Sequence, residues 1–319
     1  MDLIIIDGLS FALPLFIMAV GGIYSERSGI VMLALEGLQG FGAFTGALAV
    51  IMLRPVLGPA FPYMIYIAMA AAMLGGMVYS MLHAVLCINF KAGQTISGVV
   101  VNILSVALTA FFTSVINKAL TGDATNRFQI GVSVRFTVPG ISHIPVIGAV
   151  FKNMYPYEIV IMVCAVIAWY IFYKTRFGLR LRACGDNPHS LDAVGGDVGA
   201  TRFKAIMVTG AFSGLGGMCF AYSIMANFSP NIYMGYGFLS IAALIFGNWE
   251  IIPTFLVCLF FGFARSGGYQ LCLNLGMSSN FSDLFLVLPY VLTLLSLVFF
   301  SKHNRPPRAS GEIFDKGKR

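Results

Sequence analysis

Long, uninterrupted apolar runs recur along the whole chain, and they constrain its fold more than any other feature. A helix needs about 20 apolar residues to cross the hydrocarbon core of a bilayer. Runs of this kind, two of them shorter, lie at 3–24, 30–53, 63–88, 95–116, 157–173, 205–226, 236–247, 251–264 and 283–300. Transmembrane barrel strands alternate apolar and polar residues, so continuous runs argue against a barrel. The sequence predicts an all-α, polytopic membrane protein with about nine (eight to ten) transmembrane segments, some of them short or re-entrant half-helices.

Composition supports this fold class, because only 10% of the 319 residues are charged and 58% are apolar. Soluble domains carry about 25% charged residues. The residues before the first run include Asp2 and Asp7 and no Lys or Arg, unlike a signal peptide. The first run is therefore expected to remain as a transmembrane segment.

The runs at 236–247 and 251–264 leave the topology open. They fit two short crossings, a re-entrant hairpin or one long interrupted helix. Cytoplasmic loops of membrane proteins carry an excess of Lys and Arg. A layout with the loop 174–204 in the cytoplasm, in which the pair crosses twice or turns back, puts most basic residues inside. This layout predicts an outside N-terminus and a cytoplasmic C-terminus.

Domain boundaries follow from the same layout. We expect one transmembrane domain at 1–304 and a basic cytoplasmic tail at 305–319. The loop 117–156 is expected outside, and its length indicates that it presents a surface of its own. In a membrane protein, the net charge of +7 mainly informs the orientation of the chain in the membrane, and it does not indicate a nucleic-acid partner.

Motifs for chemistry are absent from the sequence. There is no GxxxxGK[ST] phosphate loop, HExxH motif, GxSxG elbow or paired Cys/His metal spacing. The sequence predicts no enzyme, no metal site and no bound cofactor in this chain. Uphill transport would draw on an ion gradient or on a separate ATPase subunit.

The cytoplasmic loop 174–204 contains a local helix signal. Asn187 is a good N-cap, Pro188 suits the first helical position, and Gly195 or Gly196 suits the C-terminal cap. These residues predict a helix at 188–194 with Leu191 and Val194 on one face. The segment is either a solvated basic loop or a docking element for a cytoplasmic partner, and the capped helix favours docking.

Three segments carry a family resemblance. TRFGLRLRACGDNPHSLDAVGGDVGATRFK at 175–204 resembles the cytoplasmic coupling segment of bacterial ABC importer permeases. GGIYSERSGIVMLALEGLQGFGAF at 21–44 is similar to the Ser-Glu-Arg-Ser/Ala-Gly and Leu-Glu-Gly signatures of that family. GYGFLSIAALIFGNW at 235–249 and FGFARSGG at 261–268 resemble its Gly-Tyr-Gly-Phe and Gly-x-x-Arg-x-Gly-Gly segments. The match is strongest to the nucleoside-uptake branch of the branched-chain amino acid and simple-sugar permeases.

The resemblance implies a multi-subunit importer in the bacterial cell membrane. Its expected partners are a second permease subunit, often a different chain, and a cytoplasmic ATP-binding-cassette ATPase that binds ATP and Mg. An external solute-binding protein, often a lipoprotein, would deliver the substrate. The residues expected to couple to the ATPase are Arg180, Arg182, Gly185, Asn187, Pro188, Leu191 and Val194.

Polar residues inside the apolar runs are candidates for the substrate pathway, because such residues usually face protein or a water-filled path. Glu36 either lines a pathway or hinge, or caps N–H groups freed where neighbouring glycines allow a helix break. Asn102 lies centrally in 95–116 and is the strongest single candidate, although lone polar residues are more often interhelical bonding groups. The full candidate set is Glu36, Gln39, His83, Asn102 and Asn227.

The sequence is consistent with three functions. The first is a nucleoside permease of an ABC importer. The second is a permease of the same architecture for simple sugars or branched-chain amino acids. The third is an ion-driven secondary transporter with Glu36 as the coupling carboxylate.

Overall fold

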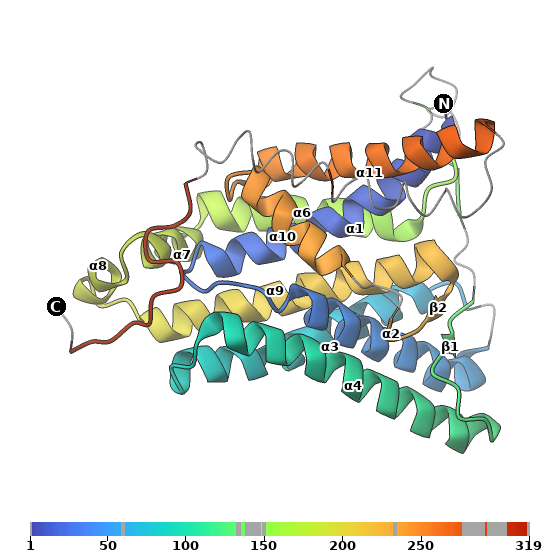
Figure 1. Cartoon of the computed structure of the whole chain (residues 1–319), viewed down its shortest axis with the longest axis horizontal. Helices are drawn as coiled ribbons and strands as arrows, with labels where there is room; N and C mark the ends of the chain where they lie inside the picture. The colour runs from blue at the N-terminus through green and yellow to red at the C-terminus, as the bar shows by residue number, and fades with distance from the viewer. Residues whose placement is uncertain are drawn as a thin grey trace.

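The computed structural model describes residues 2–58, 61–131, 135–137, 148, 151–231, 235–275, 291 and 305–317. Within these residues, seven helices are long and apolar enough to cross a membrane. They run side by side along the long axis of the molecule (Figure 1). Their bounds are α1 (Asp2–Glu26), α2 (Leu35–Leu57), α3 (Met64–Ala84), α4 (Gln94–Thr121), α6 (Pro156–Lys174), α9 (Val198–Phe220) and α11 (Ile251–Asn274).

Two of these helices continue as short π-helical turns, at Val85–Asn89 after α3 and at Ala221–Met225 after α9. The predicted run at 283–300 lies outside the described residues. The run at 251–264 is predicted to be short, but α11 continues to Asn274. Polar residues such as Ser266 and Gln270 end the apolar run without ending the helix, because hydrogen bonds within the helix satisfy the backbone in either environment.

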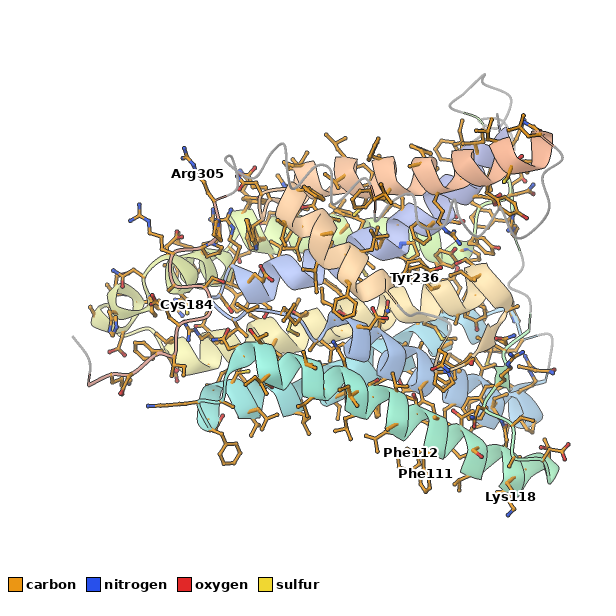
Figure 2. All side chains as sticks on the ribbon, in the orientation of Figure 1. Phe111, Phe112, Lys118, Cys184, Tyr236 and Arg305 are labelled. Atoms are coloured by element: carbon orange, nitrogen blue, oxygen red, sulfur yellow. The ribbon has the colours of Figure 1, made fainter. Side chains whose placement is uncertain are left out.

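The centre of the bundle is formed by α1 and α9. Their most apolar windows are 72% and 78% buried, against 22% for α4, which lies at the edge. Small residues allow close helix contact, as at Gly42 of α2, where an added Cβ would lie 2.2 Å from the Cα of Gly214 in α9. Phe111, labelled in Figure 2, is exposed on the outer side of α4, whereas the ring of the neighbouring Phe112 lies 6.3 Å from that of Phe44 on α2.

Two helices begin inside the bundle. Non-helical chain at 27–34 leads from the end of α1 to the start of α2, near the middle of the molecule (Figure 1). The short helix α10 (Tyr236–Phe246) also begins near the middle, where Figure 2 labels Tyr236. The pair predicted from 236–247 and 251–264 is therefore a half-helix followed by a full-length helix.

A small antiparallel sheet closes the end of the bundle that holds the N-terminus. The sequence predicts no strands, but β1 (Phe128–Gln129) pairs with β2 (Asn227–Phe228). The ring of Phe44 on α2 lies 6.0 Å from that of Phe128 and 5.8 Å from that of Phe228. This contact anchors part of the loop 117–156 on the bundle.

The opposite end carries α7 (Arg176–Asp186), α8 (Pro188–Ala193) and the tail residues 305–317. The helix α7 is not predicted from the sequence; it begins where the Thr175 side chain accepts a hydrogen bond from the backbone N–H of Gly178. The N-terminus and the C-terminal tail lie at opposite ends of the molecule (Figure 1). The tail therefore shares its end of the bundle with the predicted coupling segment.

Candidate functional site

The carboxylate of Glu36 binds the start of the half-helix α10. Its Oε1 accepts a hydrogen bond from the backbone N–H of Gly235, and its Oε2 accepts one from that of Gly237, each at 2.7 Å. Gln39, one turn further along α2, also hydrogen-bonds to Glu36. The N-terminal end of a helix carries partial positive charge, so the carboxylate neutralises the end of α10.

The close approach of the two helices requires glycine at 237. A Cβ at this position would lie 2.5 Å from the backbone nitrogen and Cα of Glu36. The predicted capping role of Glu36 is thus observed, but the N–H groups that it binds belong to α10. They are not the N–H groups near Gly37, Gly40 and Gly42 in its own helix.

Asn102 on α4 binds the start of α2 in a similar way. Its Oδ1 accepts a hydrogen bond from the N–H of Gly37 at 2.7 Å, and its Nδ2 donates to the carbonyl of Leu33 at 2.8 Å. Ser105, one turn later, donates to the carbonyl of Gly37 at 2.7 Å. Both helices that begin inside the bundle therefore have their first turns bound by side chains from other helices.

A cavity of about 280 Å³ lies beside these two helix starts. Glu36, Asn102, Ser105 and Thr109 contribute its polar lining. The aromatic ring of Phe238, whose residue is 49% exposed, adds an apolar wall. The remaining side of the cavity is aliphatic, from Val99, Ile103 and Val106.

The lining suits an uncharged solute. Small-molecule sites combine apolar walls with a few convergent polar groups. Here the single carboxylate is already bound to two backbone N–H groups. The cavity is therefore mostly apolar, with an aromatic face, a few polar side chains at its edge and no free charge.

The structure brings together Glu36, Gln39 and Asn102 but separates the other two pathway candidates. His83 is fully buried, and its Nδ1 lies 2.8 Å from the hydroxyl of Ser97. Asn227 lies in β2, opposite Gln129 in the small sheet at the far end of the bundle. These two residues lie in other regions of the bundle and do not line the cavity.

Three cavity residues escaped the sequence analysis: Ser105, Thr109 and Phe238. The signal for the first two was present, because Asn102, Ser105 and Thr109 follow the i, i+3, i+7 spacing of one helix face. Phe238 is the last residue of the Gly-Tyr-Gly-Phe motif at 235–238, but the motif by itself does not show that Phe238 lines a cavity with residues of α4.

The predicted coupling helix forms close to the expected bounds, as α8 at Pro188–Ala193. Asn187 caps it by accepting a hydrogen bond from the N–H of Ser190 at 3.2 Å. Pro188 occupies the first turn, and Gly195 follows the helix with a φ of 78°. The local capping signals are therefore confirmed.

The predicted shared face of Leu191 and Val194 is wrong. Leu191 is 4% exposed and packs with Cys184 and Val198, whereas Val194 is 81% exposed. The reason is that the helix ends at Ala193, so Val194 leaves the helical register and points into solvent. Burial raises the pKa of the Cys184 thiol and keeps it a neutral member of this small core.

The other coupling candidates differ in their surroundings. Arg182 lies over the rings of Phe172 and Tyr173, at 5.6 and 5.5 Å, so it braces α7 against the end of α6. Arg180 is exposed on α7. Gly185 is buried, and its carbonyl accepts a hydrogen bond from the N–H of Ala309 in the tail.

The long apolar helices, the two helix starts inside the bundle and the cavity beside them define a polytopic membrane protein of the permease class. The family model described as the permease component of the branched-chain amino acid transport system matches residues 4–297. The chain belongs to this permease family.

Permease proteins of bacterial ABC transporters are similar to this chain. The chain is 38% identical over 325 residues to the guanosine ABC transporter permease protein NupQ of Bacillus subtilis, covering 100% of this chain and 98% of the relative. It is 35% identical over 320 residues to the nucleoside ABC transporter permease protein NupC of Lactococcus lactis, with the same coverage. The guanosine ABC transporter permease protein NupP of Bacillus subtilis is 24% identical over 278 residues, which are 85% of this chain and 75% of the relative. No solved structure matches the chain.

Proposed function

We propose that this chain is a membrane permease subunit of an ABC importer that translocates nucleosides. The observation that carries the proposal is the neutral cavity at the two helix starts. A nucleoside is uncharged, and its base and hydroxyls suit an aromatic wall beside hydrogen-bonding side chains. The names of the relatives NupQ and NupC support the same substrate class.

The cavity argues against one of the alternatives. Free helix N-termini attract anions such as the carboxylate of an amino acid. Here Glu36 and Asn102 already bind the N–H groups of Gly235, Gly237 and Gly37. A zwitterionic branched-chain amino acid would find no free anion site, whereas nucleosides and simple sugars need none.

The bonded state of Glu36 also disfavours an ion-driven mechanism. A coupling carboxylate has to exchange its partners as protons or ions bind and leave. Glu36 directs one oxygen to Gly235 and the other to Gly237. We propose instead that transport is powered by ATP and Mg bound in a separate ATPase subunit that contacts α8.

Further partners follow from the family and from the relatives. NupQ and NupP are two different guanosine permease proteins of one organism, and both resemble this chain. We infer a second, different permease subunit beside this one, and an external solute-binding protein that meets the loop 117–156. The proposed layout in the bacterial cell membrane has one permease domain at 1–304, with the N-terminus outside and the tail 305–319 in the cytoplasm.

Reconstitution tests the proposed function. The chain is co-expressed with the permease, ATPase and binding-protein genes that accompany it, and uptake of labelled guanosine is measured against labelled glucose and leucine. We expect ATP-dependent nucleoside uptake that survives collapse of the proton gradient while ATP is maintained. Uptake that stops with the gradient would overturn the ATP-driven mechanism, and preference for glucose or leucine would overturn the substrate class.

A further inference from the structure

The C-terminal tail 305–317 lies across one end of the bundle and joins segments that are far apart in the sequence. The backbone N–H of Arg305 donates to the Asn248 side chain at 2.8 Å, in the turn between α10 and α11. Further along, Ala309 donates to the carbonyl of Gly185 at 2.9 Å, at the end of α7. Figure 2 shows Arg305 and Cys184 at this end of the molecule.

The far end of the tail completes the packing of α8. Phe314 packs against the core formed by Cys184, Leu191 and Val198, and its ring lies 5.2 Å from that of His189. Lys316 pairs with Asp192 of α8 at 3.5 Å. A helix of six residues has no stability of its own, so its position depends on this packing.

The near end of the tail holds the turn that follows α10. Asn248 and Trp249 adopt φ values of 52° and 55°, a conformation that non-glycine residues rarely take. The end of α1 supports the same turn, because Arg27 donates to the carbonyl of Trp249 at 3.1 Å and Trp249 donates to Glu26. The turn is thus a defined element to which the tail is bonded.

Anchors between the two ends keep the tail in place. The guanidinium of Arg202, which is 3% exposed, donates to the carbonyl of Glu312 at 3.0 Å. Gly311 donates to the carbonyl of Gly29 at 3.1 Å. The tail is therefore bonded to α9 and to the segment that follows α1, as well as to α8 and the turn after α10.

We propose that the tail 305–317 is a tether that positions α8 and links its movement to α10. This inference rests on the proposed function, in which α8 contacts the ATPase. The other end of α10 is bonded to Glu36 beside the cavity. Phe314 and Asn248 are then positioning residues: one connects the tether to the coupling helix, and the other connects it to the half-helix that borders the cavity.

Paired substitutions separate the tether from general packing. Asn248→Gly keeps the positive φ accessible and removes the oxygen that binds Arg305, whereas Asn248→Asp keeps both the oxygen and tolerance of this φ. Phe314→Ala removes the ring from the core at α8, whereas Phe314→Leu retains an apolar side chain there. Neither position lines the cavity.

The measurement uses the complete transporter, reconstituted with its ATPase and binding protein. The readouts are the amount of assembled complex, cross-linking of Val194→Cys to the ATPase, and guanosine molecules imported per ATP hydrolysed. We expect Asn248→Gly and Phe314→Ala each to lower the import per ATP by about tenfold while the complex still assembles, in line with typical coupling strengths between sites. Asn248→Asp and Phe314→Leu should recover most of the ratio.

The double variant gives the sharpest test. If both substitutions break the same tether, the double variant should lower the import per ATP no further than either single variant, so the two effects should not add. The tether would be overturned by losses that add in the double variant. It would also be overturned if the import per ATP stayed unchanged or rose in the single variants. Absence of the cross-link from Val194→Cys with an intact tail would instead refute the ATPase contact at α8, and the tether with it.

Discussion

The carboxylate oxygen of Glu36 lies 2.7 Å from the backbone nitrogen of Gly235, although 199 residues separate them in the chain. This bond joins the first turn of α2 to the start of α10, two helices that both begin inside the bundle. A membrane interior has no water to satisfy free N–H groups, so a broken helix there needs such a partner. The same bond helps to compensate the charge of the carboxylate in one wall of the cavity.

Glu36→Gln is expected to destabilise the permease and to reduce uptake. A glutamine oxygen accepts from one N–H group, but its NH₂ group cannot accept from the other. Hydrogen bonds to charged groups contribute about 1.5–3 kcal/mol each, so we expect the free energy of unfolding to fall by this amount. Thermal unfolding of the purified protein measures it. The exposed Glu250→Gln is the matched control, and equal stability of the two variants would contradict the capping role.

Asn102→Leu is expected to lower the stability of the fold, because it leaves the N–H of Gly37 without its acceptor. An unsatisfied buried donor costs about 1–3 kcal/mol. Asn102→Asp keeps the acceptor but loses the donor to Leu33, so its loss should be smaller. Unfolding temperature and uptake per folded molecule are measured together. Normal stability with abolished uptake would show that Asn102 acts on solute alone.

Leu191→Asp and Val194→Asp are expected to fail for different reasons. Leu191 is 4% exposed, and burying a leucine side chain contributes about 1.5–3 kcal/mol, so Leu191→Asp should disrupt the packing of α8. Val194 is 81% exposed, so Val194→Asp should leave stability unchanged and weaken co-purification with the ATPase. Limited proteolysis of the cytoplasmic end and pull-down of the ATPase distinguish the two. Undiminished ATPase binding by Val194→Asp would place the contact elsewhere.

The proposed orientation predicts which thiols are reached from each side of the membrane. Five native cysteines are buried and Cys164 is partly buried. An introduced exposed cysteine should therefore react with a thiol reagent faster than the native ones. Ala124→Cys, in the exposed stretch before β1, should react with a membrane-impermeant maleimide in intact cells. Lys316→Cys, whose native side chain is 76% exposed, should react only after permeabilisation. The reverse labelling pattern would show that the chain has the opposite orientation in the membrane.

The binding protein is expected to meet the same outer loop. Asn126→Cys lies in the exposed stretch that precedes the anchored Phe128, so it should cross-link to the solute-binding protein during transport. Lys316→Cys, at the other end of the molecule, is the control and should give no such product. Intact transport without a cross-link from Asn126→Cys or its exposed neighbours would argue that the loop only covers the permease.

Local signals in the sequence predicted those elements whose causes are local. Asn187, Pro188 and Gly195 mark the ends of α8 through hydrogen bonds and dihedral angles within a few residues. They did not predict the direction of Val194, because a helix end one residue earlier changes where a side chain points. The helix α7 was missed although its signals are local: Thr175 caps its start, and its buried residues Leu181 and Cys184 are spaced by three, as on one helix face.

The sequence by itself determined that this protein is a helical membrane protein, because burial in lipid demands long apolar helices whatever their arrangement. It also identified Glu36 and Asn102 as costly polar residues that need partners. Only the tertiary structure decided which partners they have. A hydrogen bond depends on distance and direction between groups brought together by packing, so Gly235 beside Glu36 and the tail beside α8 become visible only in the folded chain.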